Sequence, residues 1–241
     1  MTVNLLTMKG VHTHIGAYHI LHGVDLDIPQ GQLTMLLGRN GAGKTTTLRT
    51  LMGLWKPSQG SIQLGWKDTT RLSTPEIAEL GVAYVPETMG IFSDLTVKEN
   101  MLLAARSARR AQDLDDTRLK WIFSLFPAVE KFWNHPAGKL SGGQKQMVAV
   151  ARALVEPRAL LIVDEPSKGL APSIINNMID AFAQLKASGT TLLLVEQNLS
   201  FATRLGDHVA VMDNGKVVYA GAMQALAEDT ALQQSLLGLS L

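Results

Sequence analysis

The stretch GRNGAGKTT, residues 38–46, brings together residue types that bind phosphate. Its spacing fits the pattern G-x-x-x-x-G-K-[ST], in which glycines let backbone N–H groups surround phosphates and the hydroxyl ligates Mg²⁺. Lys44 adds a full charge, worth on the order of 4 kcal/mol per phosphate charge at 4 Å and an effective dielectric constant near 20. The candidate nucleotide-binding residues are Gly38, Arg39, Asn40, Gly41, Ala42, Gly43, Lys44, Thr45 and Thr46.

A second stretch, LLIVDEP at residues 160–166, ends an apolar strand with two carboxylates. Open α/β sheets bind their ligands at the carboxyl ends of strands, so we expect both carboxylates to lie beside the phosphate-binding loop. Asp164 is a candidate to hold Mg²⁺ through water. Thr45 is a candidate to ligate the ion through its hydroxyl. Glu165 is the candidate that polarises an attacking water, a role typically worth about 10²–10⁴ in rate. Together the two stretches predict an enzyme that hydrolyses a nucleoside triphosphate.

A third stretch, LSGGQ, comprises Leu140, Ser141, Gly142, Gly143 and Gln144 and reads as the start of a long helix. The serine and the glutamine fit an S-x-x-Q capping box. Glycine costs roughly 1 kcal/mol per helical position, so the pair needs a reason. It either admits an anion to the free N–H groups of the helix start or permits close packing against a neighbouring element. The two glycines alone would favour packing.

The chain resembles the ATP-binding subunits of ABC transporters over essentially its whole length. GRNGAGKTT, LSGGQKQ, LLIVDEP and SKGLAP occur in that family's order. The resemblance implies an ATPase with Mg²⁺, in which two subunits enclose two ATPs head to tail and residues 140–144 face the ATP of the partner subunit. It also implies two membrane-spanning permease subunits, a second ABC ATPase in a homo- or heterodimer, and, indirectly, a periplasmic or extracellular binding protein.

A closer resemblance links the chain to one subgroup of importers. GVAYVPE, DLTVKENM, SKGLAPSII and LVEQN look like the second ATPase of importers for branched-chain amino acids and related amides or urea. Glu87 stands where most of the family has a glutamine that senses Mg²⁺ and water, and Gln197 where most have a histidine. Both stay candidate catalytic residues, and Glu87 is also a candidate Mg²⁺ ligand. We therefore expect slow turnover by this chain alone and an asymmetric dimer.

Two further positions follow from the same resemblance. The family stacks an aromatic side chain on adenine, and here that place falls near Ile15, with Tyr18 as the nearest alternative. Lys168, in SKGLAP, lies in the loop that crosses the dimer in the family, and its role is open.

Composition restricts the classes of partner. Lys plus Arg number 22 against 21 Asp plus Glu, so the net charge of +1 gives no field that would attract nucleic acid. The basic run Arg106–Arg110 is expected to be a solvated helix end. There is no cysteine, no signal-peptide pattern at the start and no apolar run of the eighteen or so residues that a membrane span needs. We expect a peripheral subunit at the cytoplasmic face of the inner (cell) membrane, held there by its partners.

The elements that must position these residues form an α/β pattern. Residues 33–37, 160–163 and 192–195 are continuous apolar strands of the kind found inside parallel sheets. A capping box at Thr96–Glu99 opens helical patterns that continue to about residue 133, and apolar residues at helical spacing cover 174–185. Asn214-Gly215 marks a hairpin turn. The expected fold is a P-loop NTPase of the ABC type, a mixed sheet core with antiparallel β pieces and an inserted helical subdomain.

The family also implies a division of the single ATP-binding domain, residues 1–241. The core would comprise about 1–88 and 153–241, and the helical subdomain about 89–152, where it would help to receive a membrane-spanning partner. The alternative function is a soluble ABC-type ATPase in repair or translation, although such proteins usually carry insertions or tandem cassettes. A P-loop kinase is disfavoured because LSGGQ and DEP have no task there.

Overall fold

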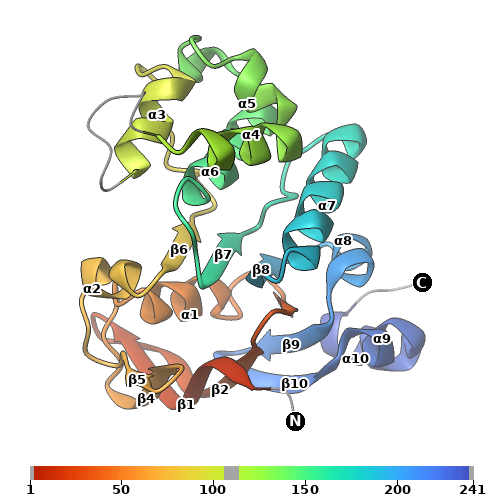
Figure 1. Cartoon of the computed structure of the whole chain (residues 1–241). Helices are drawn as coiled ribbons and strands as arrows, with labels where there is room; N and C mark the ends of the chain where they lie inside the picture. The colour runs from red at the N-terminus through yellow and green to blue at the C-terminus, as the bar shows by residue number, and fades with distance from the viewer. Residues whose placement is uncertain (1–2, 106–113, 239–241) are drawn as a thin grey trace.

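Two β-sheets and a layer of helices make up the computed structural model, which describes residues 3–105 and 114–238. Figure 1 shows the four-stranded sheet at the lower left, the six-stranded sheet extending from β6 and β7 in the middle to β9 and β10 at the lower right, and helices α3 to α6 above. The strands are β1 (Asn4–Ile15), β2 (Tyr18–Pro29), β3 (Leu33–Gly38), β4 (Gln59–Leu64), β5 (Lys67–Asp68), β6 (Val82–Val85), β7 (Leu160–Asp164), β8 (Thr191–Glu196), β9 (His208–Asp213) and β10 (Lys216–Ala222).

The larger sheet has the order β10-β9-β3-β8-β7-β6, and its strands run parallel except for the β10 edge. Every residue of β3, β7 and β8 is buried because helices cover one face and the second sheet and α1 cover the other. Along β7, Leu161 and Val163 face one core, whereas Leu160 and Ile162 face the other. This two-sided burial confirms the predicted parallel strands and fixes where their carboxyl ends emerge.

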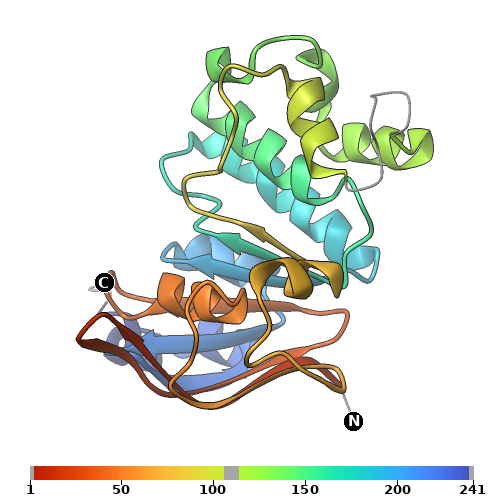
Figure 2. The ribbon, with the colours of Figure 1, turned by 90° about the vertical axis from the view of Figure 1, so that its left-hand side faces the viewer.

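The smaller sheet is antiparallel, with the order β2-β1-β4-β5. Helix α1 (Lys44–Leu51) lies between the two sheets, where Leu48 and Leu51 pack with residues of both (Figure 2). The predicted mixed fold with antiparallel β pieces is therefore present. Its consequence for the site is that α1, which begins at the phosphate-binding loop, is held from both sides.

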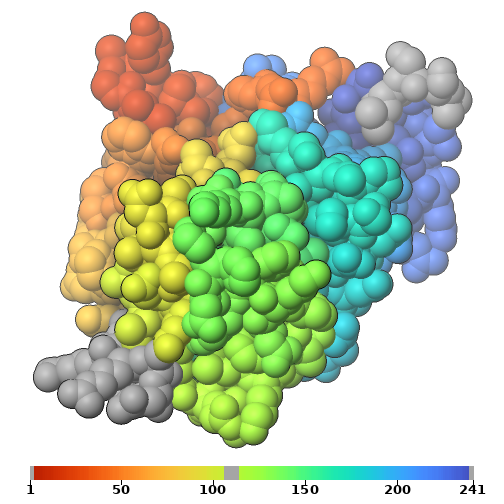
Figure 3. Space-filling view, turned by 90° about the horizontal axis from the view of Figure 1, so that it is seen from above, coloured from red at the N-terminus to blue at the C-terminus, as the bar shows by residue number. Residues whose placement is uncertain are grey.

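Most of the remaining helices lie on the other face of the large sheet. In Figure 3 the helices of residues 116–153, in green, cover the top of the molecule, and α7 in cyan lies beside them. Described in chain order after α1, they are α2 (Thr74–Glu79), α3 (Val97–Ala104), α4 (Asp116–Leu125), α5 (Pro127–Lys131), the 3₁₀ turn Ala137–Lys139, α6 (Gly142–Ala153), α7 (Pro172–Ala187), α8 (Leu199–Leu205), α9 (Met223–Glu228) and α10 (Thr230–Leu237).

Local sequence signals account for several of these boundaries. Thr96 caps α3 and closes a capping box with Glu99, as predicted. The helix expected over 174–185 is α7, which begins earlier at Pro172 because proline suits the first helical turn. Asn214 and Gly215 have φ of 45° and 74°, which confirms the hairpin turn between β9 and β10.

Two sequence-based expectations concern the helical region and the membrane. The basic run Arg106–Arg110 lies outside the described residues. Within residues 3–105 and 114–238, no helix combines the length and the apolar content that a membrane crossing requires.

Candidate functional site

The loop between β3 and α1 is shaped by its glycines. Gly38, Gly41 and Gly43 have φ of 150°, 81° and 104°, a region that side chains with a Cβ rarely enter. A Cβ at Gly38 would also collide with the carbonyl oxygen of Met212 on β9. Gly43 is the N-cap of α1, and no side chain caps this helix start. The free N–H groups and positive end of α1 are thus available to an anion.

Lys44 is buried inside this loop. Its Nζ donates to the carbonyl oxygens of Gly38 at 2.7 Å and Arg39 at 3.1 Å. Burial lowers the pKa of Lys44, and the charges of Glu165 and Asp164 oppose that shift. The ammonium is therefore held at the mouth of the loop, where it can exchange a carbonyl partner for a phosphate oxygen.

Asp164, the last residue of β7, meets α1 across the sheet edge. Its Oδ2 accepts a hydrogen bond from Thr45 Oγ1 at 3.0 Å and from the Tyr84 hydroxyl at 3.4 Å. Burial, followed by the nearby charges of Glu165 and Glu87, raises the pKa of Asp164. Burial likewise raises the pKa of Tyr84 to about 12, so this hydroxyl remains a proton donor at neutral pH.

The same two residues fit a magnesium ion. Asp164 Oδ1 is buried and has no hydrogen-bond partner among the described residues, although a buried carboxylate oxygen normally has one. Mg²⁺ commonly binds through one or two carboxylates, with water and substrate phosphates supplying the other oxygens. Thr45 Oγ1 and Asp164 would hold the ion in this arrangement, and its charge would neutralise that of the phosphates.

Glu165 is the first residue after β7, and several groups fix it. Its φ of 49° lies in the left-handed region, which is strained for a residue with a side chain. Gln197 Nε2 donates to its Oε1, and Lys168 Nζ lies 3.2 Å from its Oε2. The carboxylate also lies 3.9 Å from Lys44 Nζ. This placement at the phosphate-binding loop suits a group that accepts a proton from water.

Lys44, Thr45, Glu165 and Lys168 line one pocket of about 330 Å³, which Asp164 adjoins through its hydrogen bond with Thr45. Glu87, Glu165 and Lys168 line it opposite the phosphate-binding loop, whose contributing residues are Asn40, Gly41, Gly43, Lys44, Thr45 and Thr46. The structure therefore brings together the two carboxylates and the loop that the sequence predicted separately. Ala42 is buried beneath the loop, and its carbonyl accepts a hydrogen bond from the Gly215 N–H at 2.9 Å.

Near the end of the β1–β2 hairpin, the residue that lines this pocket is not one of the two expected to contact the base. Ile20, rather than Ile15 or Tyr18, is among the residues that line the pocket, and Tyr18 is 75% exposed. Side chains two apart on a strand share a face, so the position of Tyr18 on β2 could have pointed to Ile20. The assignment of Ile15 and Tyr18 to the base stays a prediction.

A buried glutamate that was not predicted from the sequence connects two loops of the site. Glu196 ends β8 and is buried, and its carboxylate accepts N–H bonds from Ser167 at 2.8 Å and Gln197 at 3.2 Å. It therefore joins the loop after Glu165 to the loop that carries Gln197. A charged residue at the end of an otherwise apolar strand was the available sequence signal.

The second glycine-rich helix start, at α6, is built differently. Ser141 Oγ accepts from the Gln144 N–H at 3.3 Å, and Gln144 Oε1 accepts from the Ser141 N–H at 2.9 Å, which confirms the capping box. A Cβ at Gly143 would approach Ile174 to 2.7 Å, whereas one at Gly142 would meet nothing within 4 Å. Gly143 thus satisfies the packing interpretation, and Gly142 leaves an open face.

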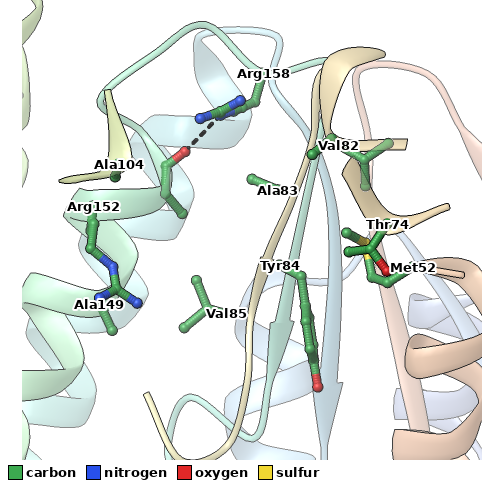
Figure 4. Close-up of a pocket in the computed structure, with 12 residues that line it drawn as sticks. Met52, Thr74, Val82, Ala83, Tyr84, Val85, Ala104, Ala149, Arg152 and Arg158 are labelled. Carbon is green, nitrogen blue, oxygen red and sulfur yellow. Dashed lines mark hydrogen bonds between the residues drawn. The ribbon is translucent and has the colours of Figure 1, made fainter. Parts of the chain in front are cut away.

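A groove of about 350 Å³ runs along β6, with residues of α6 and of the α1 and α2 region contributing to its lining. Figure 4 shows Ala149 and Arg152 of α6 on one side of β6, and Met52 and Thr74 on the other. Arg152 donates to the carbonyl oxygens of Gly90 at 2.7 Å and Met89 at 3.3 Å. It thereby ties the end of α6 to the segment that follows Glu87.

The chain matches known proteins over nearly its full length. A family model described as "ABC transporter" matches residues 21–168. The high-affinity branched-chain amino acid transport ATP-binding protein BraG of Pseudomonas aeruginosa is 36% identical over 236 residues, which cover 97% of this chain and 100% of that protein.

Solved structures give the same family of folds. An ATP-binding cassette of an ABC transporter in its ADP conformation matches with a TM-score of 0.83 at 25% identity, covering 99% of this chain and 100% of that one. Another cassette, in a dimeric post-hydrolysis state bound to ADP and Pi, matches with a TM-score of 0.79 at 24% identity, covering 90% and 98%.

Proposed function

The chain belongs to the ABC transporter family as a subunit that binds and hydrolyses ATP to drive transport, and from this premise we propose that it powers the import of branched-chain amino acids or related amides. The observation that carries the choice of solute is the 36% identity to BraG over the whole of that protein. The solute itself would be selected by the membrane and binding-protein partners. The chain would sit at the cytoplasmic face of the cell membrane through those partners.

We further propose a role for each part of the site. The loop of residues 38–46 binds the phosphates, Thr45 and Asp164 hold Mg²⁺, and Glu165 accepts the proton of the attacking water. The pocket that Thr45 and Glu165 share, the hydrogen bond from Thr45 to Asp164, and an Asp164 Oδ1 without a partner among the described residues support these roles. Glu87 and Gln197 lie at its edge, Glu87 on the pocket wall and Gln197 against Glu165.

The helix start at Ser141–Gln144 is proposed to face the ATP of a second ABC subunit. Gly142 is open to approach, and the capping box holds the first turn of α6 in place. A dimer of two such chains, or of this chain and a different ATPase, would complete two ATP sites. One fold relative is dimeric in its ADP-bound and Pi-bound state, which fits this arrangement.

The groove beside β6 is proposed as the seat of a permease segment. We also propose the division into a core of about 1–88 and 153–241 and a helical subdomain of about 89–152, with the groove at their junction. Apolar residues of β6 and α6 line it, together with Arg152. Tyr84 lines the groove and also donates to Asp164, so a segment seated there would contact a residue that is hydrogen-bonded to a proposed Mg²⁺ ligand.

Uptake measurements test the proposed import. A strain of the source organism that lacks this chain should lose most uptake of radiolabelled leucine, isoleucine and valine. Wild-type protein should restore it, and Lys44→Ala should not. Labelled acetamide and urea form the second arm, and labelled glutamate is the control solute.

Normal uptake of all five solutes in the deleted strain would refute this assignment. It would favour the alternative, an ABC-type ATPase that does not act in transport. Loss of amide or urea uptake alone would keep the importer and change its solute class.

A further inference from the structure

Lys168 connects two carboxylates that come from different segments of the chain. Its Nζ lies 2.6 Å from Glu87 Oε1, which follows β6, and 3.2 Å from Glu165 Oε2, which follows β7. The lysine side chain is 55% exposed, yet its ammonium also lines the phosphate pocket. These two hydrogen-bonded carboxylates raise the pKa of Lys168, so it stays charged at neutral pH.

The two oxygens of Glu165 have different partners. Gln197 donates to Oε1 and is neutral, whereas Lys168 pairs with Oε2 and is charged. Lys44, the other cation near this carboxylate, is 3.9 Å away and already donates to the carbonyls of its own loop. Lys168 is therefore the cation placed to fix the orientation of Glu165, whose backbone is in the strained left-handed region.

The solvent exposure of Lys168 and its two carboxylate partners indicates whether these contacts should affect stability or turnover. Solvent-exposed ion pairs contribute little to stability, and Lys168 and Glu87 are 55% and 45% exposed. Glu165 is only 9% exposed, so its contact with Lys168 is screened less. A small loss of alignment of a catalytic group can nevertheless lower a rate strongly. The pair is thus expected to matter for turnover more than for folding.

We propose that Lys168 is a positioning residue of ATP hydrolysis, which holds Glu165 toward the phosphate pocket by tying it to Glu87. This inference rests on the role proposed above for Glu165. Lys168 is not required for the fold or for capturing ATP, which the phosphate-binding loop does. It adds a positive charge to the wall of the pocket that Glu87 and Glu165 also line.

Three variants test the proposal through steady-state phosphate release. Lys168→Met keeps the length of the side chain and removes its charge, so kcat should fall about tenfold while the KM for ATP changes less than twofold. Lys168→Arg should restore at least half of the wild-type kcat. Lys67→Met, on an exposed lysine of β5, is the matched control and should behave as wild type. Thermal melting should be unchanged in all three.

A second readout does not depend on catalysis. Removal of the Lys168 charge should strengthen Mn²⁺ binding in the presence of ADP by about threefold or more, because the pocket becomes more negative. Electron paramagnetic resonance of free Mn²⁺ measures this affinity. Lys168→Arg should leave it unchanged.

An unchanged or raised kcat in Lys168→Met would overturn the proposal, as would weaker Mn²⁺ binding. A tenfold loss that Lys168→Arg leaves unrepaired, together with a lower melting temperature, would also overturn it. Glu165→Gln in the same assay separates the two claims. Full-rate hydrolysis by Glu165→Gln would refute the role of Glu165 itself, whereas an inactive Glu165→Gln beside a normal Lys168→Met refutes only the role of Lys168.

Discussion

Two helices of this protein begin at glycine-rich sequences, and their first turns differ. At α1 the N-cap is Gly43 in a left-handed conformation, without a capping side chain, and its first residues, Lys44 and Thr45, lie next to the carboxylates of Glu165 and Asp164. At α6 the N-cap is Ser141, and the protein's own Gln144 completes a capping box. The pocket that contains Lys44 is not lined by residues of α6.

The difference shows that the two helix starts are not duplicates. The first has free N–H groups, a buried lysine and the oxygens of Thr45 and Asp164 beside them, the groups that we propose for a nucleoside triphosphate and its metal ion. The second has a capping box and an open face at Gly142, and we propose that it faces a nucleotide bound by a second subunit. The proposed dimer would bring the two kinds of helix start together.

The largest effect is expected from the removal of Lys44, the side chain that distinguishes the start of α1 from that of α6. Lys44→Ala should weaken Mg-ATP binding by at least about 100-fold, because it deletes the buried ammonium that faces the phosphates. Titration with a fluorescent ATP analogue measures this, with Lys67→Ala as the control. Unchanged affinity would mean that the nucleotide binds elsewhere.

The next prediction asks whether the second helix start acts on a partner's nucleotide. Ser141→Arg and Lys44→Ala should each be inactive as homodimers. When the two variants are mixed, one composite site of the heterodimer combines an intact phosphate-binding loop with an intact α6 start. Loss of one phosphate-contacting donor typically costs about 10²–10³ in rate, so the rescued hydrolysis should stand well above background.

Subunit exchange must be shown separately, by mixing wild type with Lys44→Ala. Nucleotide trapping is measured beside hydrolysis, because isolated dimers are expected to turn over slowly. If exchange occurs and neither readout recovers at any ratio, α6 does not act on the partner's nucleotide.

A smaller effect is expected from substitutions of the two glycines of α6, which separate packing from ligand contact. A Cβ at Gly142 meets nothing, so Gly142→Ala should raise stability by up to about 1 kcal/mol while hindering a nucleotide and lowering turnover. Gly143→Ala should instead destabilise the protein, because its Cβ approaches Ile174 to 2.7 Å. Urea unfolding and ATP hydrolysis measure the two effects. A Gly142→Ala variant with full activity would show that the open face contacts no ligand.

The smallest effect concerns stability: the buried carboxylate of Asp164 destabilises the nucleotide-free protein. Burial raises the pKa of Asp164, so the folded state binds this proton more tightly than the unfolded state. The stability contributed by the protonated form is present at low pH and is lost as pH rises through the raised pKa. Asp164→Asn should therefore raise the melting temperature at pH 7–8, by about 2–4 °C for each kcal/mol gained in the free energy of unfolding. The gain should be smaller near pH 4. An equal gain at both pH values would contradict this origin.

The fold and the groups of the site were predictable where the sequence carries a local signal. The apolar strands 33–37, 160–163 and 192–195 and the capping boxes at Thr96 and Ser141 have signals within a few residues, and the structure has each of them. The two-sided burial of the parallel strands then fixed where Asp164 and Glu165 would emerge.

The remaining features depend on contacts between distant segments. Lys168 meets Glu87, 81 residues away, and Tyr84 meets Asp164, 80 residues away. No spacing along the chain indicates such a meeting. Ile20 lines the pocket, but nothing in the local sequence distinguishes it from Ile15 and Tyr18, whose contact with the base stays a prediction.

Helix α6 has a mechanical consequence. Its 12 residues, Gly142–Ala153, span about 18 Å as one unbroken rod, since each residue rises 1.5 Å. One end carries the glycine face, and the other end is clamped through Arg152 to the segment after Glu87, beside the groove. Because an unbroken helix moves largely as one body, we expect a segment that shifts α6 at the groove to shift the end that carries Gly142 as well.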